Sequence, residues 1–98
     1  MITPEIKDRV EKTVDKYVDE NLSIVIDHRN LMEPQIFLIK HTAVDIILRR
    51  DYGWGGGRFA KAIVDDKLSH AIEHADNLCL RSLKLFVLIK LWVSSKYD

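Results

Sequence analysis

The stretch YGWGGGRFAKAI, residues 52–63, could form a ligand site, because it holds all four glycines of a chain of 98 residues, three of them consecutive. A glycine-rich turn that leads into a helix leaves backbone N–H groups without helical partners, and the helix dipole adds partial positive charge there. Basic side chains stand on both sides of the turn. The pattern predicts a site for a phosphate or carboxylate, made by Gly55, Gly56, Gly57, Arg58, Lys61 and Arg49 and walled by Trp54.

A purely structural role for the same glycines stays open. Glycine clusters are typical of sharp turns, and here one could let two helices reverse direction while Trp54 and Phe59 fill the core. The stretch has neither a Gly-x-Gly-x-x-Gly pattern nor a Lys-Ser/Thr ending, the features of common phosphate-binding loops.

The string HAIEH places His70 and His74 four residues apart, the spacing at which two side chains on one helix face share a metal ion. With Glu73 it matches the H-x-x-E-H signature of one class of zinc proteases. A catalytic zinc also needs a third ligand and a shaped cavity, and Asp66 and Asp76 are the other local carboxylates. The alternative is that the residues between the histidines face the core. We predict no metal site and keep His70 and His74 as the weak candidates for one.

Groups suited to catalysis are scarce. Asp65 and Asp66 are typical of a helix boundary with solvated charge. Cys79 stands among apolar residues, which would raise its pKa rather than activate it. The sequence therefore predicts no enzyme activity, no catalytic residue and no cofactor.

The elements that must position these groups are helical. Apolar residues at three- and four-residue spacing predict a first helix over residues 4–20, with Thr3 as its N-cap. A second is expected from Gln35 to about Arg50, with Gly53 as a left-handed C-cap. Short helices are expected over residues 59–64 and 68–75, the latter capped by Asp66, and a last helix over about 77–93.

The predicted fold is therefore all-α, a compact bundle of four to six helices in a single domain, residues 1–98. Residues 1–33 would form an amphipathic helix and a connector, and residues 34–98 a helical core with the glycine-rich turn at 53–57. Residues 21–33 can be read as a short helix or as a loop.

Composition and charge limit the classes of protein to which this chain can belong. Apolar residues make up 47% of the chain and charged residues 31%, which is typical of a globular domain. Fifteen basic residues balance fifteen acidic ones, which disfavours a general nucleic-acid binder, because such proteins are basic. The most apolar run, residues 83–93, contains two lysines and is shorter than the roughly 20 residues of a membrane span. With one cysteine and no apolar leader, an intracellular protein without membrane contact is expected.

Two helices carry more apolar side chains than one helix face can hold. In the last helix the surplus predicts a homodimer or another protein interface through Phe86, Ile89, Trp92 and Tyr97, since aromatic side chains often anchor such contacts. The alternative is that the monomer's own bundle buries them all.

Residues 49–76 resemble a group of short proteins from tailed phages and prophages. In those proteins a helix ends at a glycine, a phenylalanine opens a short alanine-containing helix after a turn, and a further helix ends in Ala-Asp. The matching residues are Gly53, Gly57, Phe59, Ala62, Ile63, Val64, Leu68, Ala71, Ala75 and Asp76. The chain departs from the pattern at Gly55 and Gly56, where prolines are usual, at Arg58, where a small residue is usual, and at Lys67, where an acidic one is common.

The resemblance implies a viral origin and action in the host cytoplasm. Its first functional implication is a protein that binds a host or defence protein stoichiometrically, with counter-defence of the anti-CRISPR kind as one form. The alternative is a sponge that sequesters a nucleotide or another anionic small molecule at the glycine-rich turn. A regulatory nucleic-acid binder is the third hypothesis.

Overall fold

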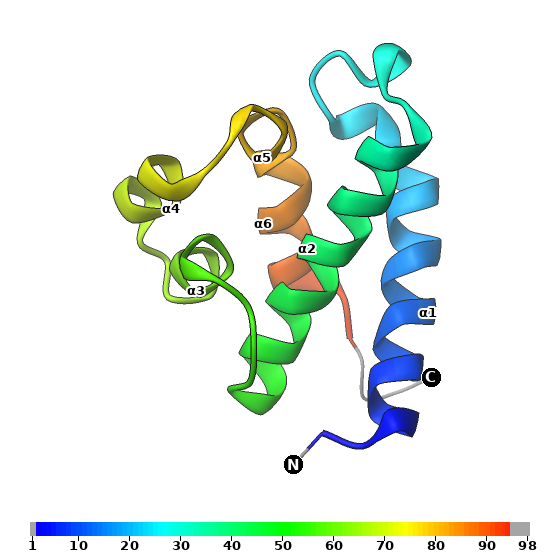
Figure 1. Ribbon diagram of the computed structural model, residues 1–98, viewed down its shortest axis with the longest axis vertical. Helices are drawn as coiled ribbons and strands as arrows, with labels where there is room; N and C mark the ends of the chain where they lie inside the picture. The colour runs from blue at the N-terminus through cyan, green and yellow to red at the C-terminus, as the bar shows by residue number, and fades with distance from the viewer. Residues whose placement is uncertain (1, 95–98) are drawn as a thin grey trace.

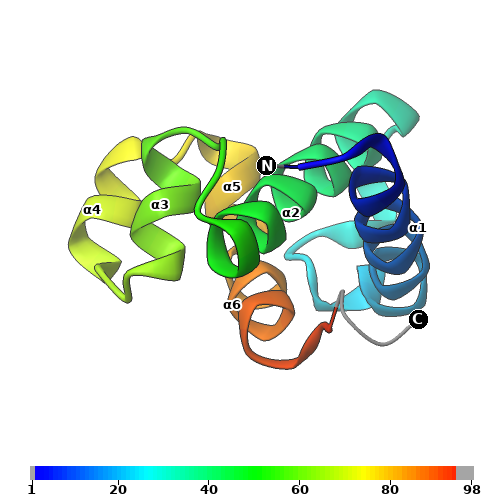
Figure 2. The same cartoon turned by 90° about the horizontal axis from the view of Figure 1, so that it is seen from below.

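The structure, a computed structural model, describes residues 2–94, and within them the predicted all-α bundle is confirmed (Figure 1). Its helices are α1 (Pro4–Asn21), α2 (Glu33–Tyr52), α3 (Arg58–Val64), α4 (Leu68–His74), α5 (Asn77–Arg81) and α6 (Leu83–Trp92). Helix α2 is central, because it packs against α1, α3 and α6. Seen from below, α1 lies on one side of α2 and the α3–α4 pair on the other (Figure 2).

Helix α1 begins and ends almost where its sequence predicts. The backbone N–H of Ile6 donates to Thr3 Oγ1 at 3.2 Å, which confirms the predicted N-cap. Val10, Val14 and Val18 recur at four-residue spacing and are fully buried. A single apolar stripe on a charged helix thus produces one buried face, the expected result for a surface helix.

The connector between α1 and α2 is largely irregular rather than α-helical. It contains two short 3₁₀ helices, Leu22–Ile24 and His28–Asn30, separated by three residues of which the last, Asp27, has φ +61°. Arg81 of α5 fastens it, because its Nε donates to the Ile26 carbonyl at 3.0 Å and its carbonyl accepts from the Ile26 N–H at 3.0 Å. A contact 55 residues away in sequence therefore decides the shape of this segment.

Helix α2 runs slightly beyond its predicted ends and stops at the predicted glycine. Gly53 has φ +64°, and its N–H donates to the Arg49 carbonyl at 3.1 Å. Buried side chains cover much of the helix circumference: Ile39, Ala43, Val44, Ile46, Ile47 and Leu48. This distribution explains why α2 occupies the centre of the bundle.

The last predicted helix is two helices, and the prediction of a single one was wrong. At Ser82 the backbone has ψ 6°, and its N–H is shared between the carbonyls of Leu78 and Cys79. This tight turn ends α5 and redirects α6 toward α2. The predicted cap at Asp66 was also wrong, because Asp66 lies in a left-handed conformation at φ +59° and Lys67 is the N-cap of α4. The Asp66 carboxylate instead pairs with Lys90 of α6.

The core takes up two of the residues predicted to face a partner. Phe86 is 1% exposed and Ile89 is 0% exposed. The Phe86 ring packs edge-on against Phe59 with ring centroids 5.6 Å apart. The turn at Ser82 directs this face of α6 into the bundle, so these two side chains belong to the core and the prediction of an interface role for them was wrong.

Arg50 joins the ends of α2 and α6. Its guanidinium pairs with both carboxylate oxygens of Asp51, at 2.8 and 2.9 Å. The same group donates to the backbone carbonyls of Lys90 and Val93, each at 2.6 Å. Since the last carbonyls of a helix lack helical partners, this arginine satisfies the end of α6 from a neighbouring helix.

Candidate functional site

The glycine-rich turn adopts backbone conformations that require glycine. Gly55 has φ +73° and Gly56 has φ +75°, in the left-handed region that other residues rarely enter. A Cβ on Gly56 would lie 3.1 Å from the Ala60 Cβ and 3.6 Å from the Asp45 Cβ. Two of the three consecutive glycines therefore serve a tight turn and a close approach between α2 and α3.

This turn forms one end of a groove between α1 and α2, with a volume of about 430 Å³. We call it the Phe37–Trp54 groove, lined by Lys7, Glu11, Asp15, Phe37, Lys40, His41, Val44, Asp45, Leu48, Trp54, Gly55 and Gly56. Phe37 is 68% exposed and Trp54 is 54% exposed. Trp54 is therefore largely exposed to solvent. The purely structural role considered for the glycines expected both Trp54 and Phe59 to fill the core, and of these two only Phe59 is buried.

Carboxylates make this groove a poor anion site. Glu11, Asp15 and Asp45 line it together with the two glycines. Lys40, one of its two lysines, is engaged at 2.7 Å by Asp15 and at 2.8 Å by Asp19. Burial alone would lower the pKa of Lys40, but the hydrogen bonds and charges of these two carboxylates outweigh it and raise the pKa.

The carboxyl group of Asp45 is partly buried in the groove, which disfavours its charged form. Partial burial raises the pKa of its carboxyl group, although the charges of His41 and Lys7 act in the opposite direction. The His41 Nε2 lies 3.8 Å from Asp45 Oδ2, and the His41 ring stacks on Phe37 with centroids 6.4 Å apart. A carboxylate whose burial is incompletely compensated is a point where a cationic group would be stabilised.

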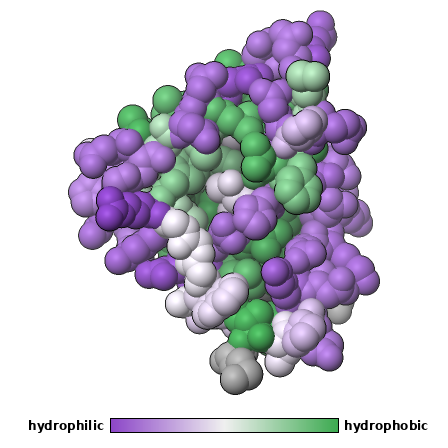
Figure 3. Space-filling view, in the orientation of Figure 1, coloured by the Kyte–Doolittle hydropathy of each residue, from purple (hydrophilic) through white to green (hydrophobic). Residues whose placement is uncertain are grey.

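Figure 3 shows how hydrophobic and hydrophilic residues are distributed on one face of the molecule. Hydrophobic residues gather down its middle, where α2 lies, between hydrophilic flanks over α1 and over α3 and α4 (Figure 3).

The seven residues predicted to hold an anion do not come together. Gly55, Gly56 and Trp54 line the Phe37–Trp54 groove, whereas Arg58 and Lys61 line another pocket on the α3–α4 side. Arg49 lines neither of these pockets, and Gly57 serves as the N-cap of α3. The seven residues therefore do not form one anion site at the glycine-rich turn, because Arg58 and Lys61 of α3 line the α3–α4 pocket instead.

Arg58 and Lys61 line a pocket together with the two histidines, His70 and His74. The α3–α4 pocket, of about 340 Å³, is lined by Arg58, Lys61, Ala62, Asp65, Lys67, His70 and His74. Sequence reasoning missed Lys67 and missed this grouping, although the three- and four-residue spacings within each helix were visible. Among residues 2–94, no group of three or more His, Cys, Asp or Glu side chains is placed to hold a metal ion.

Cys79 behaves as an apolar side chain. Burial, together with the charge of Asp76, raises the pKa of its thiol to about 11. The thiolate fraction at neutral pH is then very small, in agreement with the sequence prediction that this cysteine is not activated.

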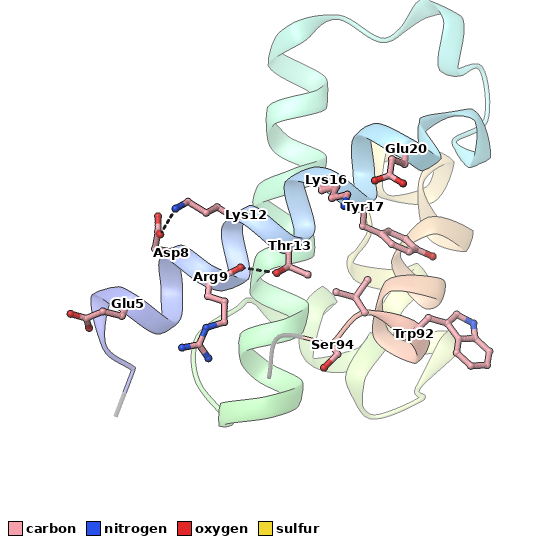
Figure 4. Close-up of a pocket in the computed structure, with 11 residues that line it drawn as sticks. Glu5, Asp8, Arg9, Lys12, Thr13, Lys16, Tyr17, Glu20, Trp92 and Ser94 are labelled. Atoms are coloured by element: carbon pink, nitrogen blue, oxygen red, sulfur yellow. Dashed lines mark hydrogen bonds and ion pairs between the residues drawn. The ribbon is translucent and has the colours of Figure 1, made fainter. Parts of the chain in front are cut away.

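A depression larger than these two pockets lies between α1 and the end of α6, with a volume of about 720 Å³. Figure 4 shows charged side chains fanning out along α1, while Trp92 projects from the end of α6. Trp92 is 71% exposed, and its role in an interface stays a prediction. Tyr97, the other residue of that prediction, lies outside the described residues, and the homodimer stays a prediction.

Two further findings do not concern a single site. No helix within residues 2–94 is both long and apolar enough to cross a lipid bilayer. Comparisons with protein-family models, with curated proteins and with solved structures found no match for this chain.

Proposed function

We propose that this chain is a noncatalytic binding protein of the phage type, which modulates a host or defence protein by stoichiometric binding. Counter-defence of the anti-CRISPR kind is one form of this proposal. The observation that carries it is the Phe37–Trp54 groove, in which two aromatic side chains are more than half exposed beside a set of charged residues.

The composition of the groove suits a protein partner. Aromatic side chains are enriched at protein interfaces, and tryptophan is prominent among the residues that contribute most to binding. Exposed Phe37 and Trp54 line the groove together with buried Val44 and Leu48, so an inserted apolar side chain would have apolar groups to contact there. Charged residues around this apolar centre would form the rim that such interfaces usually have.

The groove also suggests what the partner presents. Glu11, Asp15 and Asp45 outnumber the two lysines of the groove. Because Asp45 is incompletely compensated, a lysine or arginine of the partner beside it would gain a favourable interaction. We therefore propose a protein segment with an exposed apolar side chain next to a basic residue.

The glycine-rich turn contributes to binding by positioning Trp54. Its left-handed glycines turn the chain sharply between α2 and α3, and Trp54 is held out at the edge of the groove. The alternative of a nucleotide sponge at this turn has less support, because carboxylates share the groove with the glycines. A nucleic-acid binder has less support because the net charge is zero.

The test is a pull-down from a bacterial host lysate with three tagged proteins: the wild type, Phe37→Ala/Trp54→Ala, and the control Met32→Ala/Leu91→Ala, which removes two exposed apolar side chains outside the groove. We expect one partner at near-equal amounts with the wild type and with the control, and its loss with the double variant. Circular dichroism checks that all three are folded. The proposal fails if the wild type retains nothing above background, or if the double variant retains the same partner equally well.

A further inference from the structure

We propose that the α3–α4 pocket is a second site, which binds the phosphate group of a small phosphorylated compound. This site is separate from the Phe37–Trp54 groove, and the two share no lining residue. The proposal rests on how α3 and α4 pack, on the charge that results, and on the size of the pocket.

Close packing of the two helices brings the basic side chains to one place. Ala62 of α3 and Ala71 of α4 are small and buried, which lets the two helices approach each other closely. Arg58 and Lys61 are three residues apart on α3, and His70 and His74 are four apart on α4, so each pair shares a helix face. Both pairs line the same pocket.

The pocket carries a net positive charge. Arg58, Lys61 and Lys67 line it together with a single carboxylate, that of Asp65, so three positive charges and one negative give +2 with the histidines neutral. The neighbouring Asp66 does not line the pocket, because it pairs with Lys90 of α6. The fold thereby removes one of two adjacent carboxylates from the site.

The basic side chains are available to a ligand. Within residues 2–94, the side chains of Arg58, Lys61 and Lys67 make no hydrogen bond or ion pair with the protein. By contrast Lys40, Arg50 and Lys90 are all held by carboxylates. His74 has a neighbour, Glu73 Oε1, at 3.7 Å, but Glu73 is not part of the pocket lining.

A phosphate group matches these donors. A guanidinium presents paired N–H donors that fit phosphate oxygens, and lysines add point charges. A histidine side chain adds an N–H donor in either protonation state. A metal ion would be repelled by the three cations. The volume of about 340 Å³ lies at the lower end of the range for small-molecule pockets, so the pocket suits one compact ligand.

The test is isothermal titration calorimetry of the full chain with two ligands, inorganic pyrophosphate and adenosine monophosphate. The variant is Arg58→Gln/Lys61→Gln, and the matched control is Arg29→Gln/Lys84→Gln, which removes the same charge from exposed positions outside the pocket. We expect at least one ligand to bind the wild type with a Kd below about 10 mM, a weakening of about ten-fold or more in the variant, and about two-fold or less in the control. Tighter binding of adenosine monophosphate than of pyrophosphate would show that the site also recognises the rest of a phosphorylated compound. Equal binding of the two ligands would show that it recognises the phosphate group alone. Both results support the site.

The proposal is overturned if neither ligand binds the wild type, or if the control pair weakens binding as much as the pocket pair, since the effect would then be one of total charge. Phe37→Ala/Trp54→Ala should bind both ligands as the wild type does. This comparison keeps the result independent of whether the groove has a protein partner.

Discussion

Replacing Arg50 by alanine should destabilise the bundle severely. The Arg50 side chain is 21% exposed and that of Asp51 is 10% exposed, so their two hydrogen bonds are largely shielded from water. The substitution also removes the bonds to the carbonyls of Lys90 and Val93 at the end of α6. The mostly buried carboxylate of Asp51 and these two carbonyl groups then lose the guanidinium as a hydrogen-bond donor.

The expected size follows from these contacts. Breaking a buried ion pair by removing one partner costs about 3–5 kcal/mol, and we expect about 3 kcal/mol because the arginine is partly exposed. Total stabilities of such domains are about 5–15 kcal/mol. A loss of ~3 kcal/mol lowers the Tm of a domain of this size by about 12–24 °C.

The measurement is urea unfolding followed by circular dichroism, with Arg49→Ala as the matched control. Arg49 is the neighbouring residue on α2, and no hydrogen bond or ion pair of its side chain appears in the described part of the chain. We expect the control to lie within about 1 kcal/mol of the wild type. A loss below about 1 kcal/mol for Arg50→Ala would refute the role of this arginine as the link between α2 and α6.

Three further predictions concern single residues. Gly56→Ala should cost about 1–2 kcal/mol, because the residue has φ +75° and Ala60 lies close by, whereas Gly57→Ala should be nearly neutral at φ −90°; thermal melts of both compare them. Ser82→Ala should stabilise the protein by about 1 kcal/mol in urea unfolding, because its buried Oγ has no hydrogen-bond partner within residues 2–94. Asp45 has a folded-state pKa raised above the ordinary 3.8. The folded state therefore holds this proton more tightly than the unfolded state does, and stability falls as the pH rises from the unfolded-state pKa through the folded-state pKa. Asp45→Asn should therefore be more stable than the wild type at pH 7 and lose this advantage at pH 3, and an unchanged difference across a pH series would contradict the assignment.

Local rules account for what the sequence alone predicts correctly. The cap at Thr3, the left-handed end at Gly53 and the buried stripe of α1 each depend on residues within one or two helical turns. Such features are readable because hydrogen bonds and side-chain spacing within a helix are set by its own geometry. The all-α class follows from the same periodicity.

Contacts between distant segments decided the rest. Periodicity shows which residues share a face, but not which element that face meets. Only the tertiary structure turned Phe86 into the core, divided the last helix at Ser82, and placed the histidines of α4 beside the basic residues of α3 rather than leaving the latter at the glycine-rich turn. The physical reason is that packing of whole helices selects one arrangement among several that satisfy the same local pattern, and each candidate site of this protein lies between helices that only this packing brings together.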